Sequence, residues 1–195
     1  MPPRKERKLH IRESLIIEMA ARLIDQVGYT HLTMDMLSEQ VGIAKATLYQ
    51  HFKSKDAVMI TAAMRALENL EGFMMTASGT TIEQLRSIMR FMMVSGYDAD
   101  GFPTMIMHDE VLHIFSNQPA VAAKFQQVNT RLFALVDAAK AEGEIALDLP
   151  NEAIITMMMN TVQVARARTI YPAQPLDTLA EIVIRIFFNG LKPTI

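Results

Sequence analysis

One short segment gathers side chains whose types suit contact with phosphates and with the edges of bases. Within residues 44–52, helical spacing places Leu48 and Phe52 on one stripe. The side chains left on the other faces are Lys45, Ala46, Thr47, Tyr49, Gln50 and His51. A cation, hydroxyls, an amide and an imidazole can bond phosphate oxygens or base edges, so the segment is a candidate recognition helix.

The elements that must position this segment are short helices with clear start and stop signals. Thr33 can cap a helix that runs to about Val41, and Gly42 can turn the chain through positive φ. Ser54 can then cap a long helix from Lys55 to about Met75. Two short helices joined by a turn containing glycine predict a helix–turn–helix, which is a DNA-binding arrangement.

The sequence VGIAKATLYQHFKSKDAV, residues 41–58, resembles the DNA-binding signature of the tetracycline-repressor (TetR) family of bacterial transcriptional regulators. The matching features are Gly42-Ile43, Lys45, Thr47-Leu48-Tyr49, His51-Phe52 and Ser54-Lys55-Asp56. The resemblance implies base contacts from Lys45, Ala46 and Tyr49, and phosphate or supporting contacts from Thr33, Thr47, Gln50, His51 and Lys55. Packing between helices is the alternative role for Tyr49 and His51. Asp35 departs from the pattern, because the family often has a basic residue there, and its role stays open.

Helical patterns continue through the rest of the chain and predict an all-α protein of about nine helices. The resemblance implies that they form a three-helix N-terminal unit and a larger helical domain. Residues 1–53 would form a helix–turn–helix domain with a basic arm, and residues 54–195 a larger ligand-binding and dimerisation domain. Pro2–Lys8 is expected to be a flexible arm, serving either DNA contact or solubility. A first helix is expected over Ile11–Val27, with its core stripe at four-residue spacing: Ile11, Leu15, Met19, Leu23 and Val27.

Charge is divided unevenly along the chain. Residues 1–55 hold nine of the 19 basic and six of the 21 acidic side chains, which gives +3. The remainder holds ten basic and fifteen acidic side chains, which gives −5. A basic N-terminal quarter suits a phosphate backbone, although a solvated tail would show the same split.

Enzyme and metal chemistry find little support in the sequence. The chain has no cysteine, which excludes disulfides and thiolate metal sites. Nucleophile-elbow, phosphate-loop and zinc-protease motifs are absent, and His108, Asp109, Glu110 and His113 fit a polar helix face better than a metal site. We therefore expect no enzyme, no metal and no cofactor. Neither a secretory signal nor an apolar run long enough to span a bilayer is seen, so we expect no membrane partner and a cytoplasmic location.

Methionine is abundant in the second part of the chain, which holds most of its 16 copies. Met fills ordinary cores, but it also lines sites that accommodate varied apolar ligands. Together with nearby aromatic and polar side chains it predicts an effector pocket lined by Met89, Met93, Tyr97, Phe102, Met105, His108, Phe125, Met158 and Gln163. Acidic Asp109 and Glu110 would suit a cationic effector, whereas Arg86 and Arg90 would suit a carboxylate or acyl group.

The last two expected helices are too apolar for bare surfaces, so they form either core or a four-helix interface between two copies. The predicted interface residues are Ile154, Thr161, Ile182, Ile186 and Phe187. The function predicted is a homodimeric repressor, released from a palindromic operator in double-stranded DNA by a bulky apolar small molecule. A ligand-independent DNA-binding regulator and a helical lipid or acyl carrier are the alternatives.

Overall fold

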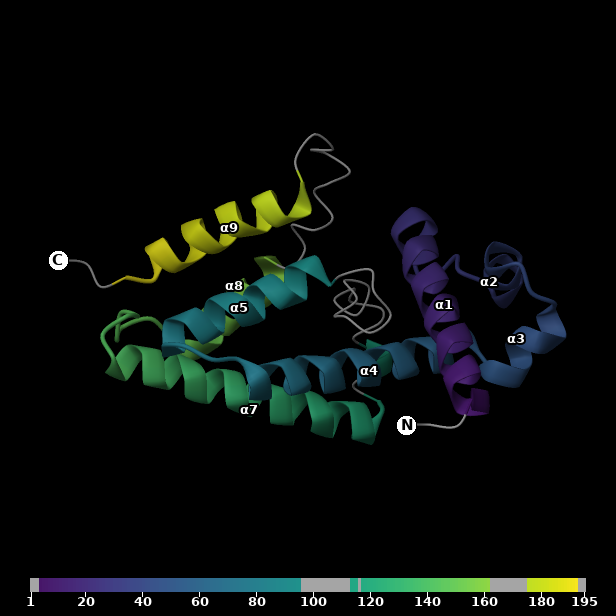
Figure 1. Ribbon diagram of the computed structural model, residues 1–195, viewed down its shortest axis with the longest axis horizontal. Helices are drawn as coiled ribbons and strands as arrows, with labels where there is room; N and C mark the ends of the chain where they lie inside the picture. The colour runs from purple at the N-terminus through teal and green to yellow at the C-terminus, as the bar shows by residue number, and fades with distance from the viewer. Residues whose placement is uncertain (1–3, 96–112, 116, 162–174, 193–195) are drawn as a thin grey trace.

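The computed structural model is all-helical throughout the residues it describes, which are 4–95, 113–115, 117–161 and 175–192 (Figure 1). Eight helices are described there, and no strand: α1 Arg4–Val27, α2 Met34–Val41, α3 Lys45–His51, α4 Lys55–Thr76, α5 Thr81–Val94, α7 Pro119–Ala141, α8 Asn151–Thr161 and α9 Leu176–Gly190. The predicted all-α class is confirmed. The sequence also predicts a short helix that Pro103 opens and that runs to about Phe115, and this stretch lies largely outside the described residues.

Helix α1 corrects two expectations. It begins at Arg4, so the flexible arm expected through Lys8 is wrong for residues 4–8; Arg, Lys and Glu are good helix formers. Its buried face is not the predicted stripe, because Ile11, Leu15 and Val27 are exposed. Strict four-residue spacing drifts around a helix that repeats every 3.6 residues, so five such positions cannot all face the core, and of the five only Leu23 is buried. The buried residues are Ile16, Ile17, Ala20, Ala21, Leu23 and Ile24.

Local capping signals were correct around the helix–turn–helix. The Met36 N–H donates to Thr33 Oγ1 over 3.2 Å, and Gly42 turns the chain at φ 73°. The Ala57 N–H donates to Ser54 Oγ over 3.1 Å, which starts α4 directly after the recognition helix. Each cap satisfies an N–H group that a helix end leaves without an intrahelical partner.

Helix α4 connects the N-terminal helices with the body of the protein. It packs on α1 near its start and against α5 and α7 further along, and Figure 1 shows it extending from one group into the other. Ion pairs join it to α7: Lys124 pairs with Glu71, and Arg131 Nη2 lies 3.5 Å from Glu71 Oε1. The hydrogen bond from Lys124 lowers the pKa of the Glu71 carboxyl, so the pair is charged.

In the body, α5 packs against α7 and α9, while α8 packs against α7. The sequence Thr81-Ile82-Glu83-Gln84 predicts a capping box that begins at Thr81. The box begins one residue earlier, because Thr80 caps α5 and Glu83 completes the box, while Thr81 donates to Glu142 Oε1 over 2.5 Å. The core here is rich in methionine, with Met59, Met89, Met92, Met93 and Met158 buried. Within the described ranges, no helix combines the length and apolar character that crossing a membrane requires.

Candidate nucleic-acid interface

Helix α3 has one buried and one exposed face. Leu48 within the helix and Phe52 just after it are buried in the core between the N-terminal helices. Within α3, four of the predicted DNA-contacting residues are exposed: Lys45, Ala46, Tyr49 and Gln50. Tyr49 keeps 40% of its surface exposed, although it is a large aromatic residue. We call these four residues the reading face.

At the start of the reading face, Lys45 pairs with Asp35. Lys45 Nζ lies 2.6 Å from Asp35 Oδ2, and both side chains are more than half exposed. The hydrogen bond to the carboxylate, supported by its charge, raises the pKa of Lys45, so its ammonium is the stable form. This contact joins α2 to α3, and it identifies a partner for the residue that departs from the family pattern.

The prediction that His51 points outward is wrong. Its side chain is only 7% exposed, and Nδ1 lies 3.8 Å from Glu13 Oε1 of α1. Arg65 of α4 holds the same carboxylate at 2.5 Å and also donates to Ser14 Oγ over 3.2 Å. His51 therefore belongs to a polar cluster between α1, α3 and α4. Periodicity within α3 could not show this, because the contacts come from residues distant in sequence.

Lys55 is also turned inward. Its Nζ donates to three backbone carbonyls, those of Tyr29 (2.9 Å), Thr30 (3.3 Å) and Leu32 (3.1 Å), and lies 4.4 Å from the Tyr29 ring centroid. These bonds use the three donors of the ammonium, so a phosphate contact would require exchanging them. That contact stays a prediction. The Tyr29 hydroxyl donates to Asp56, and burial, together with that carboxylate, raises the Tyr29 pKa.

Thr33 and Thr47 are the remaining predicted DNA contacts. Thr33 is exposed, but its hydroxyl accepts the N–H of Met36 and so caps α2. Thr47, which precedes the buried Leu48 in α3, is half-buried. Neither arrangement tests contact with DNA, and both contacts stay predictions.

The residues predicted for the effector pocket fall into different environments. Met89, Met93 and Met158 are buried in the core, whereas Phe125 on α7 is 41% exposed. The other predicted lining residues lie outside the described ranges: Tyr97, Phe102, Met105, His108 and Gln163. The pocket therefore stays a prediction, and for the three buried methionines the structure shows a packing role.

The two arginines suggested for an acidic effector already have partners. Arg90 Nη2 lies 2.6 Å from Asp177 and its Nε lies 2.9 Å from Glu181, which ties α5 to α9. The Arg86 guanidinium carbon lies 4.9 Å from the ring centroid of Phe188. Asp109 and Glu110 lie outside the described residues.

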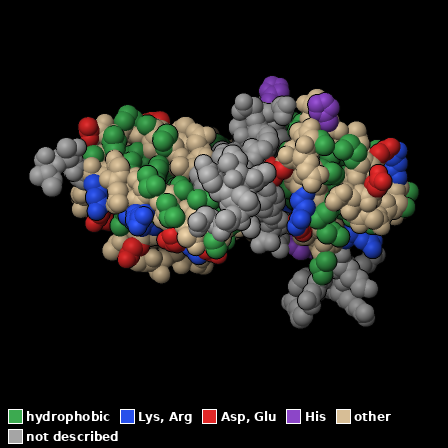
Figure 2. All heavy atoms as spheres, turned by 90° about the horizontal axis from the view of Figure 1, so that it is seen from above, with side chains coloured by type: hydrophobic (Ala, Val, Ile, Leu, Met, Phe, Trp, Pro, Cys, Tyr) green, Lys and Arg blue, Asp and Glu red, His purple; other side chains and the backbone are tan. Residues whose placement is uncertain are grey.

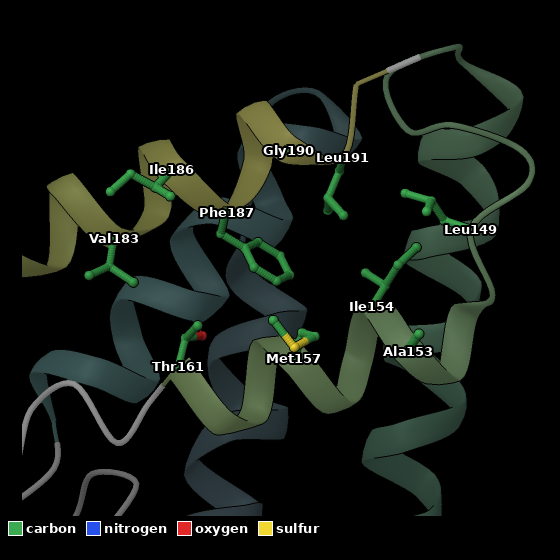
Figure 3. A pocket seen from close by; sticks show the side chains of 10 residues that line it. All are labelled: Leu149, Ala153, Ile154, Met157, Thr161, Val183, Ile186, Phe187, Gly190 and Leu191. Carbon is green, nitrogen blue, oxygen red and sulfur yellow. The ribbon is translucent and has the colours of Figure 1, made fainter. Parts of the chain in front are cut away.

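An apolar groove of about 440 Å³ runs between α8 and α9 (Figure 3). Four predicted dimer residues line it: Ile154, Thr161, Ile186 and Phe187. Phe187 points from α9 toward Met157 of α8. Met157 and Val183 of the same two apolar helix faces line it as well, and the lining residues that sequence reasoning did not select are Leu149, Ala153, Gly190 and Leu191. Their selection depends on how α8 faces α9, which helical periodicity alone does not give.

The surface around this groove is apolar as well. Met157 is 57% exposed and Ile186 is 66% exposed, and the fifth predicted residue, Ile182, is also exposed beside them. Viewed from the α9 side, hydrophobic side chains gather over this end of the molecule (Figure 2). Exposed apolar patches are typical of surfaces where a protein meets a partner.

Comparison with known proteins agrees with this geometry. Residues 16–62 match the model for bacterial regulatory proteins of the tetR family. The chain is 23% identical over 189 residues to the HTH-type transcriptional repressor KstR2 of Rhodococcus jostii (strain RHA1), covering 92% of this chain and 91% of the relative. It is 31% identical over 140 residues to the HTH-type transcriptional activator FasR of Mycolicibacterium smegmatis (strain ATCC 700084 / mc(2)155), covering 70% and 58% of the two chains. Both relatives are transcriptional regulators rather than enzymes.

The fold is shared with a solved regulator structure as well. The crystal structure of AibR in complex with isovaleryl coenzyme A and operator DNA aligns with a TM-score of 0.70 at 17% identity, covering 91% of this chain and 98% of that one. The family match spans the second half of α1, all of α2 and α3, and the start of α4. Because those helices present the reading face, and the likeness in fold extends over the body too, the chain belongs to the TetR family of DNA-binding transcriptional regulators.

Proposed function

We propose that this regulator is a homodimeric repressor that leaves a palindromic operator when a bulky apolar small molecule binds its C-terminal part. The observation that carries the proposal is the exposed reading face, in which Lys45, Ala46, Tyr49 and Gln50 lie over a buried Leu48. α3 is the second helix of the helix–turn–helix, and in that arrangement the exposed face of the second helix lies in the major groove.

On DNA, the residues of the reading face would contact different groups. Lys45 would donate to O6 and N7 of a guanine, and Ala46 would contact the methyl group of a thymine. Tyr49 and Gln50 add a phenol and an amide to the same surface, for base edges or phosphates. Thr33 and Thr47 are the supporting contacts that the family pattern implies.

A second copy of the chain is the partner proposed for the groove between α8 and α9. Two helices from each copy would make a four-helix interface that covers Met157, Ile182 and Ile186. A two-fold dimer would place two reading faces roughly 34–36 Å apart, one turn of B-DNA, which requires an operator with two-fold symmetry.

The effector would act through α4. That helix follows α3 after a three-residue connection and is tied to α7 by Glu71, Lys124 and Arg131. A ligand that favours another position of α7 would move α4 and change the spacing of the reading faces. The loss in DNA affinity would equal the ligand's preference for the state with the wrong spacing.

We propose a coenzyme A thioester as the first ligand to test as an effector, because the AibR structure contains isovaleryl coenzyme A together with operator DNA. The buried methionines of the body supply flexible apolar side chains that can rearrange around such a group. The second candidate is a regulator without a ligand, which the full burial of Met89 and Met93 favours. In that case no small molecule would alter DNA binding.

The experiment begins with a gel-shift titration of the full chain on the DNA upstream of its own gene. We expect a shifted band that disappears when Lys45→Ala and Tyr49→Ala are combined. Isovaleryl coenzyme A and octanoyl coenzyme A are then added to the complex, with coenzyme A as the control. Release by a thioester alone supports the repressor; an unaffected complex supports the ligand-independent regulator, and no complex contradicts both.

A further inference from the structure

The structure places an acidic side chain on the surface that is proposed to meet DNA. Asp35 lies in the first turn of α2, and its Oδ2 lies 2.6 Å from Nζ of Lys45, the first residue of α3. Asp35 is about two-thirds exposed, so burial does not explain why it is there. A carboxylate at this surface is repelled by phosphates, which offer only acceptors.

Both members of the pair keep capacity for further hydrogen bonds. A carboxylate has two acceptor oxygens, and the contact with Lys45 uses Oδ2, leaving Oδ1 as an acceptor. An ammonium has three donors, of which the contact with Asp35 uses one. The pair therefore offers an acceptor and donors side by side, at the end of the recognition helix that usually contacts bases.

In the major groove, only cytosine N4 and adenine N6 can donate to a carboxylate. The ammonium of Lys45, which lies beside Asp35, needs acceptors on the other base of the same pair. Guanine, the partner of cytosine, supplies two acceptors, O6 and N7, whereas thymine, the partner of adenine, supplies O4 next to a methyl group. An adjacent acceptor and cation thus fit a C·G pair better than an A·T pair.

We propose that Asp35 and Lys45 act together as a specificity-determining pair that reads one C·G base pair in each half of the operator. The inference rests on the proposed DNA-binding function and adds to it the base pair recognised. Asp35 accepts from cytosine N4, and Lys45 donates to the guanine of the same base pair.

The pair also reduces binding to other sequences. Asp35 neutralises Lys45, so together they add no net positive charge toward the phosphate backbone. Non-specific binding depends almost entirely on such charge. On a C·G pair, the hydrogen bonds of Asp35 and Lys45 to the bases compensate for the weaker attraction to phosphates. On other base pairs those hydrogen bonds are missing, and the weaker attraction is not compensated. Asp35 thus widens the difference between operator and non-operator DNA.

The test compares the full chain with Asp35→Asn and with Glu39→Gln. Glu39 is an exposed carboxylate on the same helix, and it is not among the described ion pairs, so its substitution removes the same charge without breaking the contact to Lys45. Each protein selects binding sites from a pool of randomised double-stranded DNA, and the enriched sequences are read. Affinities for the selected operator and for unrelated DNA are then measured against salt concentration.

For the unsubstituted chain we expect C·G to be preferred at one position of each half-site, by roughly tenfold over A·T. Asp35→Asn should abolish or reverse that preference, since asparagine pairs with adenine, and leave the other positions unchanged. The slope of log affinity against log salt on unrelated DNA should steepen by about 0.9 for each subunit. Glu39→Gln should leave every base preference unchanged.

Two results would overturn the proposal. If Asp35→Asn and Glu39→Gln keep the same base preferences as the unsubstituted chain, the pair acts only through charge and reads no base. If the unsubstituted chain enriches no sequence at all, the proposed function itself fails and this inference fails with it. Equal melting temperatures of the three proteins establish that each is folded.

Discussion

The two exposed helical surfaces of this protein, the reading face on α3 and the groove between α8 and α9, offer different atoms to a partner. The reading face presents an ammonium, a phenol and an amide, while the groove presents Met157, Ile186 and Phe187. Hydrogen-bonding groups suit a partner with phosphates and polar base edges. An apolar surface suits a partner whose own apolar surface is buried in the contact. The contrast separates the surface proposed to read DNA from the surface proposed for self-association.

The interiors behind these surfaces differ in a related way. Below the reading face the most deeply buried side chains include Leu48 and the β-branched Ile16 and Ile17, whose rotamers are restricted, while the methionines of α1 and α2 are only partly buried. Behind the groove the core includes Met89, Met92 and Met158, which are unbranched and adapt to irregular space. A stiff support suits a surface that must match base edges, and an adaptable one suits a domain that is proposed to change shape.

The largest loss of stability is expected from Leu48, the buried residue beneath the reading face. Leu48→Ala removes a buried side chain and should lower the free energy of unfolding by about 2–5 kcal/mol, measured by urea titration at fixed protein concentration. The exposed neighbour provides the control: Tyr49→Ala should change that free energy by no more than about 0.5 kcal/mol. Equal losses from both would mean that α3 does not present the two faces described.

A charge placed in the groove should separate the two copies. Ile186→Glu puts a carboxylate into the proposed interface and should weaken self-association by about 2–3 kcal/mol, roughly a hundredfold in dissociation constant. Sedimentation over a range of concentrations measures this. Arg185→Glu, exposed on the same helix but outside the groove, is the control and should leave association unchanged. An unsubstituted chain that sediments as a monomer would contradict the proposed use of this surface.

The smallest effect concerns the connection between the two regions. Ser54→Ala removes the cap at the start of α4 and should lower the free energy of unfolding by about 1 kcal/mol. Ser78→Ala, on an exposed residue between α4 and α5, should change it by less than about 0.5 kcal/mol. If the two substitutions cost the same in a urea titration, the hydrogen bond at Ser54 does not stabilise the junction.

Sequence signals were reliable where a few neighbouring residues determine the structure. The caps at Thr33 and Ser54 and the turn at Gly42 depend on local hydrogen bonds and φ angles, and all three were predicted. The same holds for the buried Leu48 and the exposed Lys45 of α3.

Predictions from the sequence failed where the burial of a side chain depends on contacts with distant parts of the chain. The carboxylate that faces His51 is 38 positions earlier in the chain, at Glu13, and Lys55 bonds carbonyls of the loop after α1. A strict spacing of four also misplaced the core stripe of α1, because a helix repeats every 3.6 residues. Which side chains turn inward is thus set by packing between helices, which a single sequence shows only indirectly.

Fluorescence anisotropy tests the central claim, that the reading face recognises DNA, most directly. The full chain and its Lys45→Ala, Tyr49→Ala double variant are titrated against a labelled selected operator and against unrelated DNA, at two salt concentrations. The account predicts at least a tenfold loss of operator affinity in the double variant, and a much smaller loss on unrelated DNA. Operator binding that is unchanged in a folded double variant would contradict the account.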